Sequence, residues 1–322
     1  IFATEKTLNQ FIMGLLSSLF GKSKSDANEQ EKQDKKNFDI LKYDGIRARN
    51  MGKLPYAIKC FEEATAIQEE TETLSLLVTS YTQANRLDDA RHTLERMIAL
   101  DGQQADTWIS LAGVCYMQED YKTMEEACRK AIELDSQKPL AYYFAAKAAI
   151  GLHNDFMAIA MLTKAILLKE DYTEAYQLRA ETLWNMRQVK EAGEDIQVLL
   201  RMNPNDEQAL LLDAEIQAAT GNTDQAIGQL QQILSLNPFQ EKAYFLLGEL
   251  YLSLKETEKA IAVYDEAIDI NPNFAQAYQE RGRIKLLNGD KEGSVADMKK
   301  ALELAPETEE KINGQYNNFT DK

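Results

Sequence analysis

The chain of 322 residues contains little proline and glycine, few cysteines and no long apolar run. Its 6 prolines and 15 glycines lie well below the roughly 12% that these two residues make up in average proteins, which excludes collagen-like and Gly/Pro-rich disordered classes. The longest near-continuous apolar run, residues 11–20, is about half the ~20 residues that a membrane-spanning helix needs, and no small-residue cleavage site follows it. We therefore predict neither a transmembrane segment nor a secretory signal.

Cysteine, histidine and positive charge are scarce as well. The three cysteines, Cys60, Cys115 and Cys128, form no CxxC pair, so neither a disulfide framework nor a zinc site is predicted, and a reducing, cytoplasmic location fits best. The 36 basic and 52 acidic residues give a net charge of −16, which argues against nucleic acid as a partner. His92 and His153 fall in different repeats, and no phosphate-binding loop is present. We predict no catalytic residues, no cofactor and no metal.

Four of the six prolines recur at one interval. Pro204, Pro238, Pro272 and Pro306 are each 34 residues apart, which is the spacing of a tandem repeat and not of two globular domains. If proline occupies position 32 of the repeat, small residues recur at positions 8, 20 and 27 along most of the chain. Position 20, for example, holds Ala57, Ala90, Met124, Ala158, Ala192, Ala226, Ala260 and Ser294.

Each repeat contains two apolar patterns of helical period, about 13 residues long. Small residues at positions 8 and 20 allow the two helices of a hairpin to approach closely, and position 27 admits the first helix of the next repeat. Proline at position 32 ends the second helix, because it lacks an N–H group and disfavours helix in the residue before it. A single hairpin cannot bury its apolar face alone, so we predict an all-α solenoid in which hairpins stack.

The same pattern predicts how the chain is organised. Residues 1–21 form an amphipathic arm, and residues 22–37 form a flexible linker, because this segment carries many charges and no apolar stripe. A short cap or tail follows the repeats at residues 309–322. The eight repeats are expected at residues 38–70, 71–104, 105–138, 139–172, 173–206, 207–240, 241–274 and 275–308.

The seventh repeat, residues 241–274, resembles the tetratricopeptide repeat (TPR), and eight copies in register cover nearly all of the chain. The signature residues of this copy are Tyr244, Leu247, Gly248, Tyr251, Ala260, Tyr264, Ala267 and Pro272. The resemblance implies a right-handed superhelix of helical hairpins whose first helices line a concave groove through positions 2, 5, 9 and 12. It also implies a non-catalytic scaffold that binds a peptide or helix of another protein in that groove.

The groove positions combine aromatic, apolar and acidic side chains. Glu181, Glu215 and Glu249 occupy position 9 of three consecutive repeats, and helices about 8–10 Å apart place these carboxylates too far from one another to bind one ion together. Two interpretations are open: aromatic anchors hold a partner whose basic side chains the glutamates select, or these side chains only favour helix and pack locally. The candidate peptide-binding residues are Tyr116, Tyr143, Lys147, Gln177, Glu181, Trp184, Leu211, Glu215, Phe245, Glu249 and Arg283.

One specialised form of groove is not predicted. Family members that hold chaperone C-termini use lysine, asparagine and arginine side chains from three repeats to bind carboxylates. Lys42 fits that pattern, but Ile46, Leu76, Asp106 and Ser110 do not. Chaperone-tail binding of that kind is therefore not expected.

The segment before the repeats carries a near-complete apolar stripe at helical period. Its members are Leu8, Phe11, Ile12, Leu15, Leu16, Leu19 and Phe20. A helix over about residues 8–20 is predicted to dock onto its own repeats or onto a second copy of the chain, so that self-assembly is the alternative to binding an outside partner. Membrane-surface attachment is a further, less favoured alternative, because the polar face of this helix is not basic.

Overall fold

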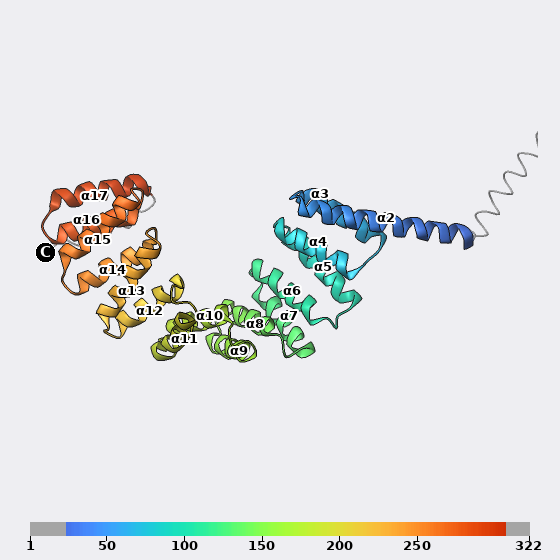
Figure 1. The fold of residues 1–322 in the computed structure, drawn as a ribbon, viewed down its shortest axis with the longest axis horizontal. Helices are drawn as coiled ribbons and strands as arrows, with labels where there is room; N and C mark the ends of the chain where they lie inside the picture. Colours follow the sequence, from blue (N-terminus) through green and yellow to red (C-terminus); the bar gives the residue numbers. More distant parts are fainter. Residues whose placement is uncertain (1–23, 307–322) are drawn as a thin grey trace, which may run out of the picture. The chain divides into compact units, whose positions relative to one another are not determined.

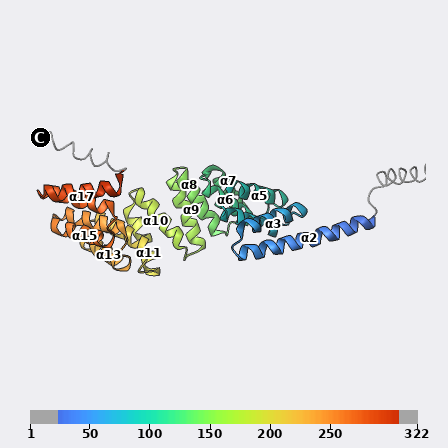
Figure 2. The same cartoon turned by 90° about the horizontal axis from the view of Figure 1, so that it is seen from above.

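The structure is a computed structural model that describes residues 24–306. Over this range the chain forms 16 α-helices and no strand (Figures 1 and 2), which confirms the all-α prediction. The apolar stripe at residues 8–20 and the predicted cap at 309–322 lie outside the described residues. None of the described helices is both long and apolar enough to cross a bilayer.

The chain divides into two compact units, residues 1–168 (unit 1) and 169–322 (unit 2). The described part of unit 1 consists of α2 (Lys24–Asn50), α3 (Leu54–Ile67), α4 (Thr71–Gln83), α5 (Leu87–Leu100), α6 (Ala105–Met117), α7 (Tyr121–Leu134), α8 (Pro139–Gly151) and α9 (Asp155–Leu168). The described part of unit 2 consists of α10 (Thr173–Asn185), α11 (Val189–Met202), α12 (Glu207–Ala219), α13 (Thr223–Leu236), α14 (Glu241–Ser253), α15 (Thr257–Ile270), α16 (Ala275–Leu287) and α17 (Lys291–Leu304).

Within each unit, successive helices pair into hairpins that pack against the next hairpin (Figure 1). From the second repeat onward, the first helix of each hairpin begins at the first residue of the predicted repeat, as α4 does at Thr71 and α12 at Glu207. These first helices have 13 residues and the second helices have 14. The 34-residue period of the sequence is therefore also the period of the hairpins.

Helix α2 is longer than the sequence pattern indicated. It begins at Lys24, so residues 24–37 are helical where a flexible linker was predicted. Glutamate, glutamine and lysine favour helix, and lengthening a helix that is already nucleated costs far less than starting one. Side-chain hydrogen bonds also connect successive turns, with Gln30 Nε2 donating to Asp34 Oδ1 and Gln33 Nε2 to Asn37 Oδ1, both at 2.8 Å.

Close packing inside each hairpin depends on positions 8 and 24. A Cβ atom added to Gly248 would overlap the ring of Tyr264, and one added to Gly45 would lie 2.6 Å from the ring of Phe61. Where position 8 is alanine, position 24 instead holds one of the less bulky residues Cys128, Leu162, Ile196 and Leu230. The prediction that a small residue at position 8 lets the two helices approach closely is therefore confirmed, and the side chain at position 24 is sized to match.

The turn inside each hairpin has the same backbone conformation in all eight repeats. Position 15 has a positive φ at Gly52, Gly221 and Gly289, and also at Asn85, Glu119, His153, Arg187 and Lys255, where φ is 56–63°. The next N–H then bonds back to the carbonyl five residues earlier, as Arg86 N does to Tyr81 O at 2.8 Å, which closes the helix end. Glycine marked only three of these eight turns in the sequence.

The second helices end with or without proline. At position 31 an aspartate or asparagine side chain accepts a hydrogen bond from the backbone N–H two residues later. The residues that accept this bond are Asp101, Asp135, Asn203, Asn237 and Asn271. This local turn satisfies backbone groups at the helix end, so α5 and α7 stop at the same register as the proline-marked helices of unit 2.

Candidate functional site

We call the surface formed by repeat positions 2, 5, 9 and 12 the inner face, and describe it separately for each unit. In unit 1 the structure brings together three predicted groove residues, Tyr116 of α6 and Tyr143 and Lys147 of α8. The Lys147 Nζ atom lies 4.2 Å from the ring centre of Tyr116 and 5.1 Å from that of Tyr143. Both rings attract the ammonium group through their π faces. Unit 1 therefore places a cation held between tyrosines on its inner face.

In unit 2 the predicted residues differ in their accessibility. Trp184 and Phe245 are half-buried, and Gln177 Nε2 donates to Glu181 Oε1 at 2.7 Å along α10. Leu211 was predicted to face the groove, but only 8% of it is exposed and it belongs to the apolar core of unit 2. Its apolar side chain packs among the buried residues of this cluster. Leu211 therefore contributes packing and is not available to a ligand.

Glu215 and Glu249 line one small pocket between α12 and α14, which we call the unit 2 pocket. Its volume is about 140 Å³. Apart from these glutamates, the walls come from Ala214, Ala218, Leu230, Leu246, Leu250 and Ser253. The pocket is thus apolar inside and carries two carboxylates, and its small size fits one side chain.

The glutamate row is partly neutralised by basic residues of unit 2. Lys242 Nζ lies 2.5 Å from a carboxylate oxygen of Glu215, and an Arg283 guanidinium nitrogen lies 2.5 Å from Glu249. Arg283 is therefore an internal partner of Glu249. Glu181 is exposed, and no basic side chain among residues 24–306 pairs with it.

Unit 2 also contains a set of ionic and polar pairs that were not predicted from the sequence. Arg179, at position 7, donates two hydrogen bonds to Asp195, at position 23, with lengths of 2.8 and 2.6 Å, and Asp195 is only 4% exposed. Arg281 pairs in the same way with the buried Asp297. Asp213, also at position 7 and buried, accepts from the amides of Gln197, Gln217 and Gln229. The recurring separation of 16 residues was the available signal.

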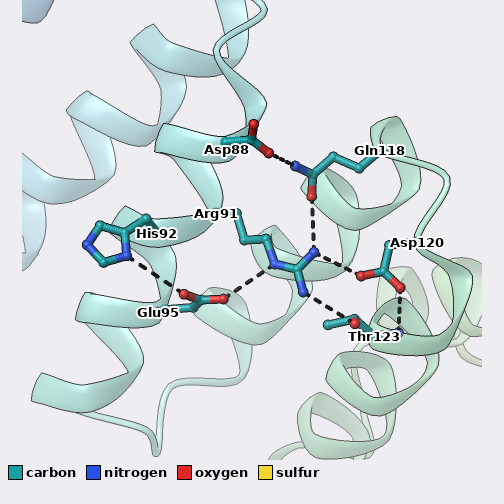
Figure 3. Close-up of polar contacts among 7 residues, drawn as sticks. All are labelled: Asp88, Arg91, His92, Glu95, Gln118, Asp120 and Thr123. Atoms are coloured by element: carbon teal, nitrogen blue, oxygen red, sulfur yellow. Dashed lines mark hydrogen bonds and ion pairs between the residues drawn. The ribbon is translucent and has the colours of Figure 1, made fainter.

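A second polar cluster joins two hairpins in unit 1 (Figure 3). Arg91 of α5 lies 2.8 Å from Asp120 and 3.3 Å from Glu95, and Asp120 also accepts from the N–H of Thr123 at the start of α7. His92 stands at the edge of the cluster, with Nδ1 3.9 Å from Glu95. Hydrogen bonding to Asp120 raises the pKa of Arg91, so its cation persists and the cluster serves to connect α5 with α7.

Two thiols of unit 1 are buried, and one histidine lies in a hairpin turn. Burial raises the pKa of Cys115 to about 11 and that of Cys128 to about 12, so both thiols are protonated near neutral pH and pack in the core of unit 1. His153 is the positive-φ residue of a hairpin turn. Within residues 24–306, no three metal-binding side chains converge.

Lys42, which matched one feature of a chaperone-binding groove, is engaged within unit 1. Its Nζ atom lies 2.7 Å from Glu70 and 2.5 Å from Glu72. Burial alone lowers the pKa of Lys42, but these hydrogen bonds outweigh it and the net shift is upward. The ammonium group is therefore held by acidic residues of its own unit.

Comparison with known proteins agrees with this architecture. A model of the tetratricopeptide repeat matches residues 76–139, 178–240 and 211–275, and a second model with the same description matches residues 275–308. A curated relative, the STIP1 homolog of Dictyostelium discoideum, is 26% identical over 128 residues, which are 39% of this chain and 22% of that protein. The chain thus spans about a fifth of the length of this relative.

Solved structures show the same fold. YrrB, described as a TPR protein with an unusual peptide-binding site, is 25% identical, with a TM-score of 0.50 over 57% of this chain and 95% of its own. A TPR protein of Parabacteroides merdae is 18% identical, with a TM-score of 0.57 over 73% of this chain and 93% of its own. Because the repeat models match more than half of the sequence and the hairpins follow the same period, the chain belongs to the tetratricopeptide repeat family.

Proposed function

We propose that this chain is a non-catalytic scaffold that binds a segment of another protein on the inner face of unit 2. The observation that carries this proposal is the unit 2 pocket, in which apolar walls between α12 and α14 lie beside Glu215 and Glu249. A partner segment places one aliphatic or aromatic side chain in the pocket. Apolar surface left open on a helical array is a common mark of a protein-binding site.

The carboxylates make the pocket selective for a segment that also carries lysine or arginine. Lys242 already pairs with Glu215, yet the side chain of Lys242 is 56% exposed, so it can move into water when a partner's cation replaces it. Glu215 then keeps a cationic partner throughout the exchange, because one ammonium or guanidinium group replaces another. The exposed carboxylate of Glu181, on α10, extends the same acidic surface.

The comparisons support binding to protein in general terms. YrrB is described as having a peptide-binding site, and its similarity to this chain covers more than half of the chain. The matched part of the STIP1 homolog is only about a fifth of that protein, so its other properties carry no argument here. Trp184 and Phe245, at positions 12 and 5, provide aromatic contact area on the proposed surface.

A peptide selection tests this proposal. Random peptides displayed on phage are selected on the full chain, and we expect the bound peptides to combine an aliphatic or aromatic residue with lysine or arginine. Ala218→Leu fills the pocket and should weaken the selected peptides at least about tenfold, as loss of one buried apolar side chain implies. Leu236→Ala is the matched control, because Leu236 is 51% exposed on α13 and does not line the pocket.

A second variant separates the two parts of the proposal. Glu215→Gln should weaken only those peptides that carry a basic residue. Peptides that bind the Ala218→Leu variant as tightly as the original chain would contradict the pocket as the contact. An effect of Ala218→Leu without any effect of Glu215→Gln would leave the apolar contact standing and reject the preference for basic residues.

A further inference from the structure

A second hollow lies in unit 1, between α4, α5 and α6, and its volume is about 340 Å³. We call it the unit 1 hollow. Val78, Leu94 and Met97 form its apolar floor. Its size is at the lower end of the roughly 300–1,000 Å³ that is usual for ligand sites, and none of the residues assigned to the peptide-binding surface lines it.

Three hydroxyl groups around the hollow present oxygen atoms and not protons. Ser75 Oγ donates to Thr71 O at 2.8 Å, Thr79 Oγ1 to Ser75 O at 2.9 Å and Ser110 Oγ to Asp106 O at 2.9 Å. A hydroxyl has one proton and two lone pairs, so each of these groups can still accept but no longer donate. The rim contributed by α4 and α6 is therefore an array of acceptors.

The charged and amide groups at the hollow have the same character. Asp101 accepts from Gln104 Nε2 at 2.9 Å and from Gln103 N at 3.0 Å, and these bonds lower its pKa, so it remains a carboxylate at neutral pH. The Gln104 amide uses one N–H donor in this bond, and its carbonyl oxygen can still accept a hydrogen bond. Asp106 adds a second carboxylate, paired with Lys138 at 2.8 Å, and no described residue that lines the hollow is basic.

One further hydroxyl at the hollow belongs to Thr107 of α6. Thr107 is 7% exposed and lines the hollow, yet among the described residues its hydroxyl makes no hydrogen bond. Its lone pairs are therefore available to a donor group of a ligand. Thr107 thus lines the same hollow as the acceptor rim and the apolar floor.

We infer that the unit 1 hollow binds an arginine side chain of a partner protein. A guanidinium group has five N–H donors and no acceptor, so it matches a rim that offers oxygen atoms. Its methylene stem covers the apolar floor of Val78, Leu94 and Met97. Anionic groups are disfavoured by Asp101 and Asp106, and purely apolar groups would make no hydrogen bond to the oxygen atoms of the rim.

Methyl NMR on the full chain tests this inference. The protein is labelled at its methionine methyl groups, and the probes are N-acetyl-arginine-methylamide, its lysine counterpart and its citrulline counterpart. Citrulline has the shape of arginine but is neutral and replaces one donor group by a carbonyl. The Met97 resonance should shift in a saturable way with the arginine probe. The citrulline probe should bind at least about tenfold more weakly, and the lysine probe should also bind more weakly.

Variants of the rim provide the controls. Thr79→Val removes an acceptor at nearly constant shape and should weaken the arginine probe about three- to tenfold. Thr107→Val should weaken it similarly. Thr82→Val is the matched control, because Thr82 also donates to a carbonyl of α4, Val78 O at 2.9 Å, but does not line the hollow. Because these readouts lie in unit 1, they are independent of the peptide-binding surface of unit 2.

Three results would overturn the inference. The first is a Met97 resonance that does not move with the arginine probe. The second is an equal response to the arginine and citrulline probes. The third is an arginine response that is equally strong in the Thr79→Val and Thr82→Val variants. Thr79 is exposed, so the Thr79→Val variant should fold even if the Thr107→Val variant does not.

Discussion

The two units share one hairpin geometry, yet they fill position 7 of the repeat in opposite ways. In three repeats of unit 1 this position is apolar, with Leu77, Leu111 and Ala145, whereas three repeats of unit 2 hold Arg179, Asp213 and Arg281. In unit 2 these polar groups are satisfied by partners 16 residues away, on the second helix of the same hairpin. The comparison shows that the fold tolerates either solution, provided that each buried charge keeps its partner.

The inner faces differ as well. Unit 1 presents the Lys147 cation between tyrosines and a hollow whose rim is made of hydroxyl and carboxylate oxygens, whereas unit 2 presents a small apolar pocket beside two glutamates. Positions 8, 20 and 24 hold the helices of a hairpin together and vary little in their packing role. Positions 5, 9 and 12 hold residues of more varied chemical type in the two units.

The largest expected effect comes from breaking an ionic pair of unit 2. Asp195→Ala leaves the Arg179 guanidinium half-buried without its carboxylate and should lower the free energy of unfolding of α10 and α11 by about 3–5 kcal/mol. The measurement is urea unfolding followed by hydrogen exchange of these two helices. Unit 1 should be unaffected, because the pair lies within unit 2.

A double variant provides the control for this prediction. Arg179→Leu with Asp195→Val copies Leu247 and Val263, which occupy the same two positions in the seventh repeat. Replacing a buried ion pair by apolar residues is neutral or stabilising by up to about 4 kcal/mol, so the double variant should recover the stability that Asp195→Ala loses. If Asp195→Ala lowers the free energy of unfolding by less than about 1 kcal/mol, the ionic pair does not stabilise unit 2 as predicted.

A smaller effect is expected from the hairpin contact that both units share. Gly248→Ala forces the buried Tyr264 ring to move and should cost about 1–3 kcal/mol in thermal or urea unfolding. Gly228→Ala, on α13, is the matched control: nothing lies within 4 Å of the added methyl, so a gain of up to about 1 kcal/mol is expected.

The same contact can be repaired and compared between units. Adding Tyr264→Leu to Gly248→Ala reproduces the pair of Ala214 and Leu230 in the sixth repeat and should restore much of the lost stability. Gly45→Ala in unit 1, opposite Phe61, should cost a similar amount. Additive effects of the two changes in unit 2 would show that positions 8 and 24 are not matched in size.

The smallest effect concerns the hairpin turns and should be equal in the two units. Arg187→Gly in unit 2 and Glu119→Gly in unit 1 relieve a left-handed backbone that side chains disfavour, and each should raise the free energy of unfolding by about 0.5–1 kcal/mol. Asn85→Gly should gain less, because asparagine tolerates this conformation. A gain confined to one unit would show that the turns, and not only the cores and inner faces, distinguish the units.

Sequence reasoning predicted much of the fold and only part of the candidate site. The register of the helices, the close contact at Gly248 and the grouping of Glu215 with Glu249 follow from a fixed period, because equal spacing places equivalent residues on equivalent faces. The burial of Leu211 and the helical state of residues 24–37 were not predicted. The first depends on which side chains of other helices pack against Leu211 in the core of unit 2. The second depends on continuation of a helix that the repeat already nucleates.

The sequence by itself determined the repeat, its length, the hairpin and the stacking of hairpins, since these rest on local helical preference and on apolar residues that recur every 34 positions. Only the tertiary structure decided which polar groups meet. Three arrangements each join side chains from different helices: the pair of Arg179 and Asp195, the contact of Lys147 with two tyrosines, and the rim of the unit 1 hollow. Such contacts depend on distances of a few ångströms between helices, which the pattern of residues along one chain does not contain.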